Sequence, residues 1–541
     1  MAAQVPRTAA DSQPALGTAP YDHAHHVKYQ DGELVWAAQG GDIEQPQGRV
    51  KRDDIVVVLK APEGTPGYLI YSLAEAPEGE QPFKLSVLLA PQLLEEPLAE
   101  FLLADMPAHL AVQASHLLHV IVSTRSGTGQ ATAFFDHVLR PLLAALGLEA
   151  HTEPDHPAVP GSYRVSATQS PRTVRDFARS LGAVGTSGAT SVSGNGKGSN
   201  VPAALTIVLL SGDGGVIDLL NGVGSSSSAA PPTVALLPLG TGNALFHSLH
   251  KPLYSAAEVA GASGQSPLVL GLRTLLRGAS APLPTFRASF SPGSRLVAAP
   301  EGIKAAVVAE DGDGDGDGDA HASDDEHDHP PIDHLVGAIV ASYGFHASLV
   351  WASDTTAYRA HGAKRFGMAA AELLKEAHAY AATVAVRRPG STEEELLLAP
   401  DSLNKPRKEF TYVLATLVSS LERAFTISPA SRPLDGQLRL VHFGAVDGER
   451  TMDVMRAAYR GGEHVGMRWT TQTQSDGGKE IEDGVGYDAV DEVRVTVQEP
   501  DPRWRKVCID GTIVELEDGG WMAVARSAEQ RLRVLVDPSV L

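Results

Sequence analysis

The sequence has one cysteine, Cys508, and no long apolar run. A single cysteine excludes an internal disulfide and fits a reducing compartment such as the cytoplasm. No segment approaches the roughly 18 consecutive apolar residues of a membrane-spanning helix. Residues 1–30 lack the apolar centre of a signal peptide. These absences predict a cytoplasmic protein without membrane spans.

Basic residues are also scarce, since 44 Lys and Arg face 65 Asp and Glu, which gives a formal net charge of −21. Ten of the acidic residues fall between Glu310 and Asp328, where there is no Lys or Arg. The remaining chain is therefore only moderately acidic. This balance argues against a nucleic-acid partner and against docking to membranes through a basic patch.

Composition and periodicity divide the chain into a tail and three folded parts. We expect a disordered tail at 1–30 and a small antiparallel β unit at 31–110, where short apolar runs alternate with turns. Strands alternate with helices at 111–255, and strands dominate 256–541 apart from an acidic insertion at 310–330, which we predict to be disordered. The predicted fold class is therefore α/β plus all-β.

The second part predicts a parallel sheet covered by helices on both faces, a three-layer α/β/α nucleotide-binding domain. We place its strands at 118–123, 162–168, 204–210 and 233–237, and its helices near 129–146, 171–182, 214–222 and 243–250. Gly/Ser-rich stretches at 185–200 and 224–232 are predicted to be surface insertions. Ligands of such sheets collect at the carboxyl ends of the strands.

The last part predicts an antiparallel β-sandwich with one long helix near 364–380. Its strands are expected at 335–342, 382–387, 410–418, 437–443, 491–498, 505–509 and 531–536.

Three glycine-rich turns each follow an apolar strand of the α/β part. They are Ser123–Gly129, Ser211–Gly215 and Pro238–Asn243. A strand that ends in glycine and restarts as a helix presents backbone N–H groups, and glycine lets a phosphate approach them. An ordinary β-turn is the alternative for each one alone. Because Asp213 places a carboxylate in the second turn, this pattern suggests chemistry as well as phosphate binding.

These segments and their order resemble the diacylglycerol kinase catalytic-domain superfamily and, within it, the sphingosine kinase and ceramide kinase branch. The resemblance covers residues 116–541. In the first half it rests on Ser123–Gly129, Thr168, Gly212–Gly222 and Pro238–Asn243. In the second half it rests on Ser342–Ala347, Tyr358-Arg359, Lys364–Phe366, Pro429, Asp435–Leu438 and Cys508–Gly511.

The resemblance implies ATP and Mg²⁺ as cofactors and assigns roles to individual residues. Asp213 would accept the proton of a lipid hydroxyl or orient it, and Arg359 and Arg365 would neutralise the transferred phosphoryl group. Asp510 would contact magnesium. The positions implied in nucleotide binding are Arg125, Ser126, Gly127, Gly129, Thr168, Ser211, Gly212, Gly214, Asp218, Gly240, Thr241, Gly242, Asn243 and Gly511.

The sequence departs from the family pattern at several of these positions. Ser123 begins the pair that is usually Asn-Pro, Asp218 replaces a glutamate, and Thr512 replaces the last residue of Asp-Gly-Glu. Ser348 stands where sphingosine and ceramide kinases usually have an aspartate that recognises the lipid head. The phosphate cradle is intact, whereas the identity of the lipid stays open.

We therefore expect an ATP-dependent lipid kinase that phosphorylates the primary hydroxyl of a sphingoid base during transient contact with a membrane. Diacylglycerol or ceramide is the alternative substrate, and a catalytically weak nucleotide- or lipid-binding relative and an NAD kinase are alternative functions. The run Asp313–Asp324 imitates a calcium-binding loop, but a solvated acidic insertion explains it better. The oligomeric state is not predicted.

Overall fold

The computed structural model describes most of the chain. The described residues are 21–37, 40–41, 43–76, 79–93, 98–113, 116–151, 159–183, 204–224, 230–255, 258, 264–297, 330–359, 361–362, 364–400, 405–472 and 480–541. The predicted insertions at 185–200 and 310–329, with the calcium-loop-like run, lie outside these residues, as do 225–229 and the first part of the predicted tail.

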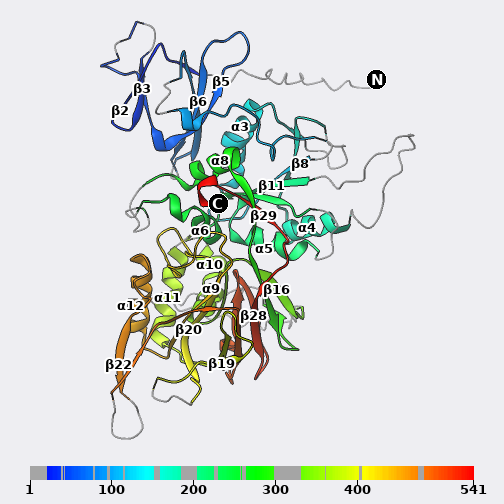
Figure 1. Cartoon of the computed structure of the whole chain (residues 1–541), viewed down its shortest axis with the longest axis vertical. Coiled ribbons are helices and arrows are strands. Elements are labelled where there is room, and N and C mark those ends of the chain that lie inside the picture. Colours follow the sequence, from blue (N-terminus) through cyan, green and yellow to red (C-terminus); the bar gives the residue numbers. More distant parts are fainter. Residues whose placement is uncertain are drawn as a thin grey trace, which may run out of the picture.

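The N-terminal unit consists of two small sheets, shown in blue at one end of the molecule in Figure 1. One has the order β1-β7-β6-β5 and the other β2-β3-β4. The strands are β1 (Asp22–His23), β2 (His26–Gln30), β3 (Glu33–Ala37), β4 (Gly48–Lys51), β5 (Ile55–Lys60), β6 (Tyr68–Glu75) and β7 (Phe83–Ala90), and short 3₁₀ turns lie at Arg52–Asp54 and Ala99–Phe101.

The prediction of a disordered tail at 1–30 was wrong for residues 22–30. Ala24 is buried there, and Val27 packs against the core between the two sheets, so a polar stretch with two inward-facing side chains becomes a strand. The alternation of apolar and polar residues in β2 is too short and too polar to predict a strand from the sequence. The strand becomes evident only from its pairing with β3.

A seven-stranded sheet in the order β13-β29-β12-β11-β8-β10-β9 forms the centre of the molecule. All its strand pairs are parallel except β13 with β29. The strands are β8 (His116–Val122), β9 (Glu149–His151), β10 (Ser162–Ala167), β11 (Ala204–Ser211), β12 (Thr233–Pro238), β13 (Ala279–Pro282) and β29 (Arg533–Val536). The predicted parallel sheet is confirmed.

Helices cover both faces of this sheet because its strands are apolar on both sides. Ile207 and Leu209 of β11 belong to the core under α4 and α5, whereas Val208 and Leu210 face the core under α3 and α8. The helices are α2 (Ala131–Phe134), the π-helical turn η3 (Phe135–Leu139), α3 (Arg140–Ala145), α4 (Thr173–Ala183), α5 (Asp213–Gly222), α6 (Ala244–His250), the 3₁₀ turn η4 (Lys251–Leu253) and α8 (Pro267–Arg277). The three-layer α/β/α arrangement is therefore present.

The α/β layers extend beyond the predicted boundary at residue 255. Helix α8 packs on this sheet, and β13 and β29 extend its edge. Figure 1 shows β29, near the C-terminus, in the middle of the molecule, and β12 separates it from β11 in the sheet. The predicted strand at 531–536 exists, but it belongs to the α/β sheet. The prediction missed this because pairing between segments about 300 residues apart leaves no local signal in the sequence.

The C-terminal domain is antiparallel, as predicted. Among the described residues, thirteen strands are connected by hydrogen bonds in the order β15-β27-β26-β17-β20-β18-β25-β28-β14-β16, with β19 on β18, β21 on β20, and β24 on β21. They are β14 (Thr285–Phe290), β15 (Arg295–Leu296), β16 (His334–Gly337), β17 (Val340–Gly344), β18 (Tyr380–Arg387), β19 (Glu394–Leu396), β20 (Glu409–Thr416), β21 (Leu438–Gly444), β24 (Gly486–Val490), β25 (Glu492–Val497), β26 (Lys506–Ile509), β27 (Thr512–Glu515) and β28 (Trp521–Ser527).

The predicted strand at 335–342 is in fact two strands, β16 and β17. The first pairs with β14 and the second with β20 and β26, so the chain passes between two parts of the folded sheet at Ala338 and Ile339. A separate hairpin is formed by β22 (Arg468–Gln472) and β23 (Glu480–Gly484).

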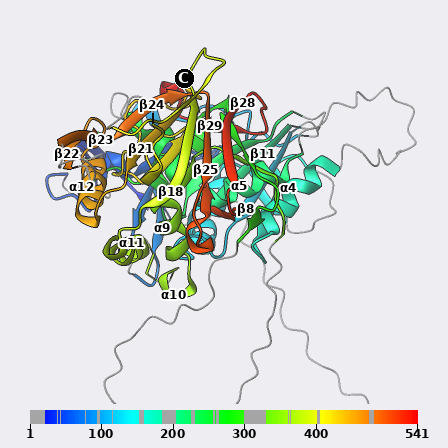
Figure 2. The same ribbon diagram turned by 90° about the horizontal axis from the view of Figure 1, so that it is seen from below.

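Among its described residues, the domain has four helices beside these strands, where one was expected. They are α9 (Phe345–Ser353), α10 (Thr356–Arg359), α11 (Lys364–Glu376) and α12 (Gly448–Tyr459), and 3₁₀ turns lie at Pro502–Trp504 and Pro538–Val540. Figure 2 shows the helices gathered on one side of the domain, away from α4. Helix α9 was not predicted because its own side chains are apolar on most sides, so the sequence shows no helical periodicity of apolar and polar residues.

Candidate active site

The three glycine-rich turns come together at the carboxyl edge of the α/β sheet. A methyl group on Gly240 would lie 2.3 Å from the Cα atom of Gly212, so the second and third turns touch backbone to backbone. Gly127 has a φ of 55°, and a methyl group there would lie 2.4 Å from the carbonyl oxygen of Leu239. Only glycine permits this packing, which explains why the sequence has glycine at the three positions.

Polar side chains tie the same turns together. The N–H of Gly212 donates to Oγ of Ser126 (2.9 Å), which joins the first turn to the second. Asn243 lies in the left-handed region with a φ of 52°, and its Oδ1 accepts from the N–H of Gly240 (2.9 Å). The N–H of Thr124 donates to Oγ1 of Thr168 (3.0 Å). Three of the predicted nucleotide-binding residues, Ser126, Asn243 and Thr168, thus hold the cradle in shape.

Asp213 begins helix α5, and its carboxylate contacts the N-terminus of the neighbouring helix α6. Oδ2 accepts from the N–H of Ala244 (2.8 Å) and Oδ1 from the N–H of Leu245 (3.1 Å). Burial raises the pKa of Asp213 against the lowering effect of these bonds. A carboxylate oxygen can accept more than one hydrogen bond, so both oxygens can receive a further donor.

Asp510 occupies a similar position in the second domain. Its carboxylate accepts from the successive N–H groups of Ala338 (2.6 Å), Ile339 (3.1 Å) and Val340 (2.5 Å). These are the residues where the chain passes from β16 to β17. The pKa of Asp510 is raised to about 7, mainly by burial and to a smaller extent by the negative charge of Asp213, although the hydrogen bonds from the three N–H groups lower it. The two carboxylates therefore face the same seam between the domains.

Asp510 and Gly511 are also the two central residues of the hairpin between β26 and β27. Their φ angles of 48° and 91° are both positive, as a two-residue turn between antiparallel strands requires. The predicted magnesium contact of Asp510 gains no support from this geometry, since its carboxylate closes a backbone turn. Gly511 is exposed, and a methyl group on it would meet no atom within 4 Å.

Helix α5 carries two further side chains that fix its place. Asn221 forms a reciprocal pair with the backbone of Val336 in β16, with both hydrogen bonds at 2.9 Å. Asp218 forms an ion pair with Arg175 of α4 (3.2 Å), although burial raises its pKa. Asp218 thus contacts the neighbouring helix, its nucleotide contact stays a prediction, and Asn221 joins the two domains.

Arg359 and Arg365 converge on Asp354, a residue that sequence reasoning missed. Asp354 follows α9 and accepts from Nε and Nη2 of Arg359 (2.8 and 2.6 Å) and from Nη1 of Arg365 (3.2 Å). An acidic residue five positions before Arg359 was the available signal. A methyl group on Gly362 between α10 and α11 would lie 4.0 Å from Cγ2 of Thr128, so this segment lies against the first glycine-rich turn.

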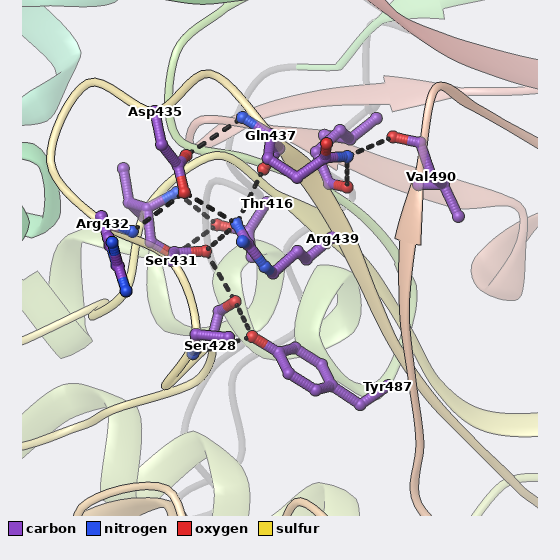
Figure 3. A network of polar contacts seen from close by, with 12 residues as sticks. Thr416, Ser428, Ser431, Arg432, Asp435, Gln437, Arg439, Tyr487 and Val490 are labelled. Carbon is purple, nitrogen blue, oxygen red and sulfur yellow. Dashed lines mark hydrogen bonds and ion pairs between the residues drawn. The ribbon is translucent and has the colours of Figure 1, made fainter. Parts of the chain in front are cut away.

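A cleft lined mostly by apolar side chains lies between α6 and the loop before β21. Its lining includes Leu245, Leu249, Ala338, Val418, Leu434 and Arg432. The loop carries the predicted Asp-Gly turn at 435–438. Figure 3 shows how Asp435 accepts from the N–H groups of Arg432 (3.1 Å) and Gln437 (3.0 Å), while the guanidinium of Arg432 points away from this network.

Two residues of the cleft also contact the carboxylates of Asp213 and Asp510. Leu245 donates its N–H to Asp213, and Ala338 donates its N–H to Asp510. The cleft therefore adjoins both carboxylates. The sequence offered no signal for it, because its walls come from segments up to 190 residues apart.

Ser348 lies inside the second domain, where it is 5% exposed. Its Oγ accepts from the hydroxyl of Tyr380 (2.9 Å). The position where the resemblance to sphingosine and ceramide kinases implied a carboxylate thus carries an uncharged hydrogen bond.

The remaining predicted nucleotide-binding residues lie in the same turns. Arg125 and Gly129 are exposed, Thr241 and Gly242 are partly buried, and the carbonyl of Ser211 accepts from the N–H of Leu239 (3.2 Å). Within the described part of the chain, three or more His, Cys, Asp or Glu side chains nowhere gather into a metal-binding group. The described helices include none that is long and apolar enough to cross a membrane.

Residues 117–267 match the family model of the diacylglycerol kinase catalytic domain. This match confirms that the segment resembles the diacylglycerol kinase catalytic domain and supports a kinase. The narrower resemblance to the sphingosine kinase and ceramide kinase branch stays a prediction. A search of the curated proteins finds no match.

Solved structures that resemble the chain include a diacylglycerol kinase from Bacillus anthracis and yeast NADH kinase complexed with NADH. The first is 10% identical, with a TM-score of 0.40, and the similarity covers 79% of this chain and 98% of that one. The second is 10% identical, with a TM-score of 0.30, and the similarity covers 86% of this chain and 89% of that one.

Proposed function

We propose that this protein is an ATP-dependent kinase that transfers a phosphoryl group to a hydroxyl group of a lipid. The family match supports phosphoryl transfer. One observation supports the lipid: Leu245 lines the apolar cleft and donates its N–H to Asp213, so an apolar surface adjoins the candidate base. A lipid with its apolar part against this cleft would bring its hydroxyl to that carboxylate.

The glycine-rich turns fit the phosphates of ATP, which would supply the phosphoryl group. A methyl group on Gly214 would meet no atom within 4 Å, so the first turn of α5 is open to a ligand. A helix N-terminus favours phosphate through its free N–H groups and its dipole. Because the described residues form no metal-binding group, we expect Mg²⁺ to be held mainly by phosphates and water.

Asp213 is the residue that we assign to the acceptor hydroxyl. Burial raises its pKa, which makes the carboxylate a better proton acceptor than an exposed aspartate. Its hydrogen bonds to Ala244 and Leu245 hold the carboxylate in one orientation. Enzymes accelerate phosphoryl transfer mainly by positioning the reacting groups and neutralising charge, so a fixed orientation favours this role. Arg359 and Arg365 would stabilise the charge on the transferred group, a task that suits the planar guanidinium.

A sphingoid base is the first substrate that we propose, because Gly242–Leu245 and Gly344–Ala347 resemble the sphingosine kinase branch. An uncharged lipid, diacylglycerol or ceramide, is the second candidate. The buried bond from Tyr380 to Ser348 favours it, since this position offers no counter-ion to an amine. Either substrate implies transient contact with a membrane from the cytoplasm, and the acidic charge gives no support to nucleic-acid binding.

Purified protein should transfer labelled phosphate from ATP to sphingosine, diacylglycerol or ceramide in mixed micelles, with NAD⁺ as a soluble acceptor for comparison. Asp213→Asn should reduce the rate at least about 100-fold because it removes the base. Since Asp213 also contacts α6, the unfolding temperature and the ATP affinity of the variant are measured alongside its activity. Asp453→Asn, at an exposed position on α12, is the matched control.

The possible results separate the proposals. Transfer to a lipid that Asp213→Asn abolishes, with ATP affinity kept, supports the lipid kinase. ATP binding without transfer to any lipid selects a nucleotide-binding relative instead. Transfer to NAD⁺ alone would select a kinase for a soluble substrate.

A further inference from the structure

Asp354 joins two arginines that come from different helices. Its carboxylate lies at the end of α9, Arg359 belongs to α10, and Arg365 belongs to α11. Arg359 donates from Nε and Nη2 to the two oxygens of Asp354, a two-pronged pairing, and Arg365 donates from Nη1. One carboxylate therefore sets the positions of two guanidinium groups.

The arrangement is more enclosed than a typical surface ion pair. The side chain of Arg365 is 17% exposed and that of Asp354 is 32% exposed. Burial lowers the pKa of Arg365, and its guanidinium lies over the ring of Phe366, with the central carbon 4.8 Å from the ring centre. Its Nε is buried without a hydrogen-bond partner among the described residues. Burying an N–H group without a hydrogen-bond acceptor costs folding free energy.

Two positive charges and one negative charge leave this cluster with a net charge of one positive unit. An arginine has five N–H donors, of which Asp354 receives two from Arg359 and one from Arg365. The others are free of Asp354 and can bind a further anion. The segment between the two arginines lies near the first glycine-rich turn, since a methyl group on Gly362 would lie 4.0 Å from Cγ2 of Thr128, so a phosphate in that cradle is the anion that the arginines would meet.

We propose that Asp354 is a positioning residue that holds Arg359 and Arg365 together for the terminal phosphates of ATP. This inference rests on the proposed function. The carboxylate offsets the repulsion between the two guanidinium groups before the nucleotide binds. It also orients them, because both of its oxygens accept hydrogen bonds, whereas an amide has only one oxygen that can do so. Asp354 itself touches no phosphate.

The test uses the full-length protein and compares Asp354→Asn and Asp354→Glu with the wild type. Affinities for ATP and for AMP are measured by calorimetry, and kcat and KM by lipid phosphorylation. Asp354→Asn should weaken ATP binding about tenfold or more and leave AMP binding unchanged, because AMP lacks the terminal phosphates. Asp354→Glu, which keeps the charge, should restore part of the loss.

Helix α12 offers a matched control. Asp453 also lies between two arginines, Arg450 and Arg456, but at an exposed site. Asp453→Asn should change neither affinity. The loss from Arg359→Ala should be smaller in the Asp354→Asn background than in the wild type, since the carboxylate acts through this arginine.

The outcomes distinguish this proposal from the proposed function. Unchanged ATP affinity in Asp354→Asn would overturn the positioning role, whether or not the wild type phosphorylates a lipid. Tighter ATP binding would also overturn it, because Asp354 would then be a competitor of the phosphate. If Asp354→Asn binds ATP more weakly but the wild type phosphorylates no lipid, the positioning role is retained and the proposed lipid kinase is refuted.

Discussion

The side-chain amide of Asn221 pairs with the backbone N–H and C=O of Val336 as a neighbouring strand would. Asn221→Ala should therefore lower the free energy of unfolding by about 2–3 kcal/mol, because both backbone groups of Val336 lose their partner. Urea unfolding measures this loss. Asn221→Asp keeps the acceptor but sets a charged oxygen against the carbonyl groups of Ile217 and Val336, so its loss should be at least as large. Equal stability of all three proteins would contradict the role of Asn221 in joining the domains.

Substitutions of Gly240 and Gly214 should differ sharply in their effects. Gly240→Ala forces the turns apart, because the new methyl group would lie 2.3 Å from a backbone atom. We expect a loss of about 3 kcal/mol or more in stability. Gly214→Ala meets no atom within 4 Å and lies in a helix, so stability should be kept or rise by up to about 1 kcal/mol, while ATP binding weakens. Thermal unfolding with and without ATP separates the two effects.

The buried carboxyl of Asp510 predicts a dependence of stability on pH. Its pKa is about 7 in the folded protein, compared with 3.8 for an ordinary aspartate. Between these values the folded state binds more protons than the unfolded state, so the contribution of Asp510 to stability falls as the pH rises through 7. The loss should be on the order of a few kcal/mol.

Buried histidines such as His250 act in the opposite sense, since burial lowers the pKa of His250 to about 4 and stability is lost as the pH falls below 6.5. The measurement is therefore the difference between wild type and Asp510→Asn in urea unfolding from pH 5 to pH 8. The wild type should lose its advantage over the variant as the pH rises. A constant difference across this range would contradict the assignment.

Arg273 predicts how the N-terminal β unit is attached. From α8 it donates through Nε to the carbonyl of Ile55 (2.8 Å) and through Nη2 to that of Arg52 (2.9 Å), and it lies over the ring of Phe101. Arg273→Ala should cost about 2–4 kcal/mol and speed proteolysis within the N-terminal unit. Arg277→Ala, at an exposed position on the same helix, should leave the cleavage rate unchanged.

Much of the α/β domain could be predicted from local pattern. Apolar strands that end in glycine and are followed by helices predicted β11, α5 and the cradle, because a buried parallel strand must be apolar on both faces. The prediction failed where partners lie far apart in the sequence. The β29 strand is a short apolar run that any sheet could accept, and only its pairing with β12 places it in the α/β sheet.

The sequence by itself determined which residues are candidates for the site: the glycine turns and Asp213 are recognisable from residue type and spacing, and Arg359 and Arg365 from the resemblance to the kinase family. Only the tertiary structure decided what their side chains contact. Asp213 is directed at α6, Asp510 at the turn between β16 and β17, and both arginines at Asp354. The physical reason is that a carboxylate binds whichever N–H groups the packed domains bring within about 3 Å, and sequence spacing does not encode that distance.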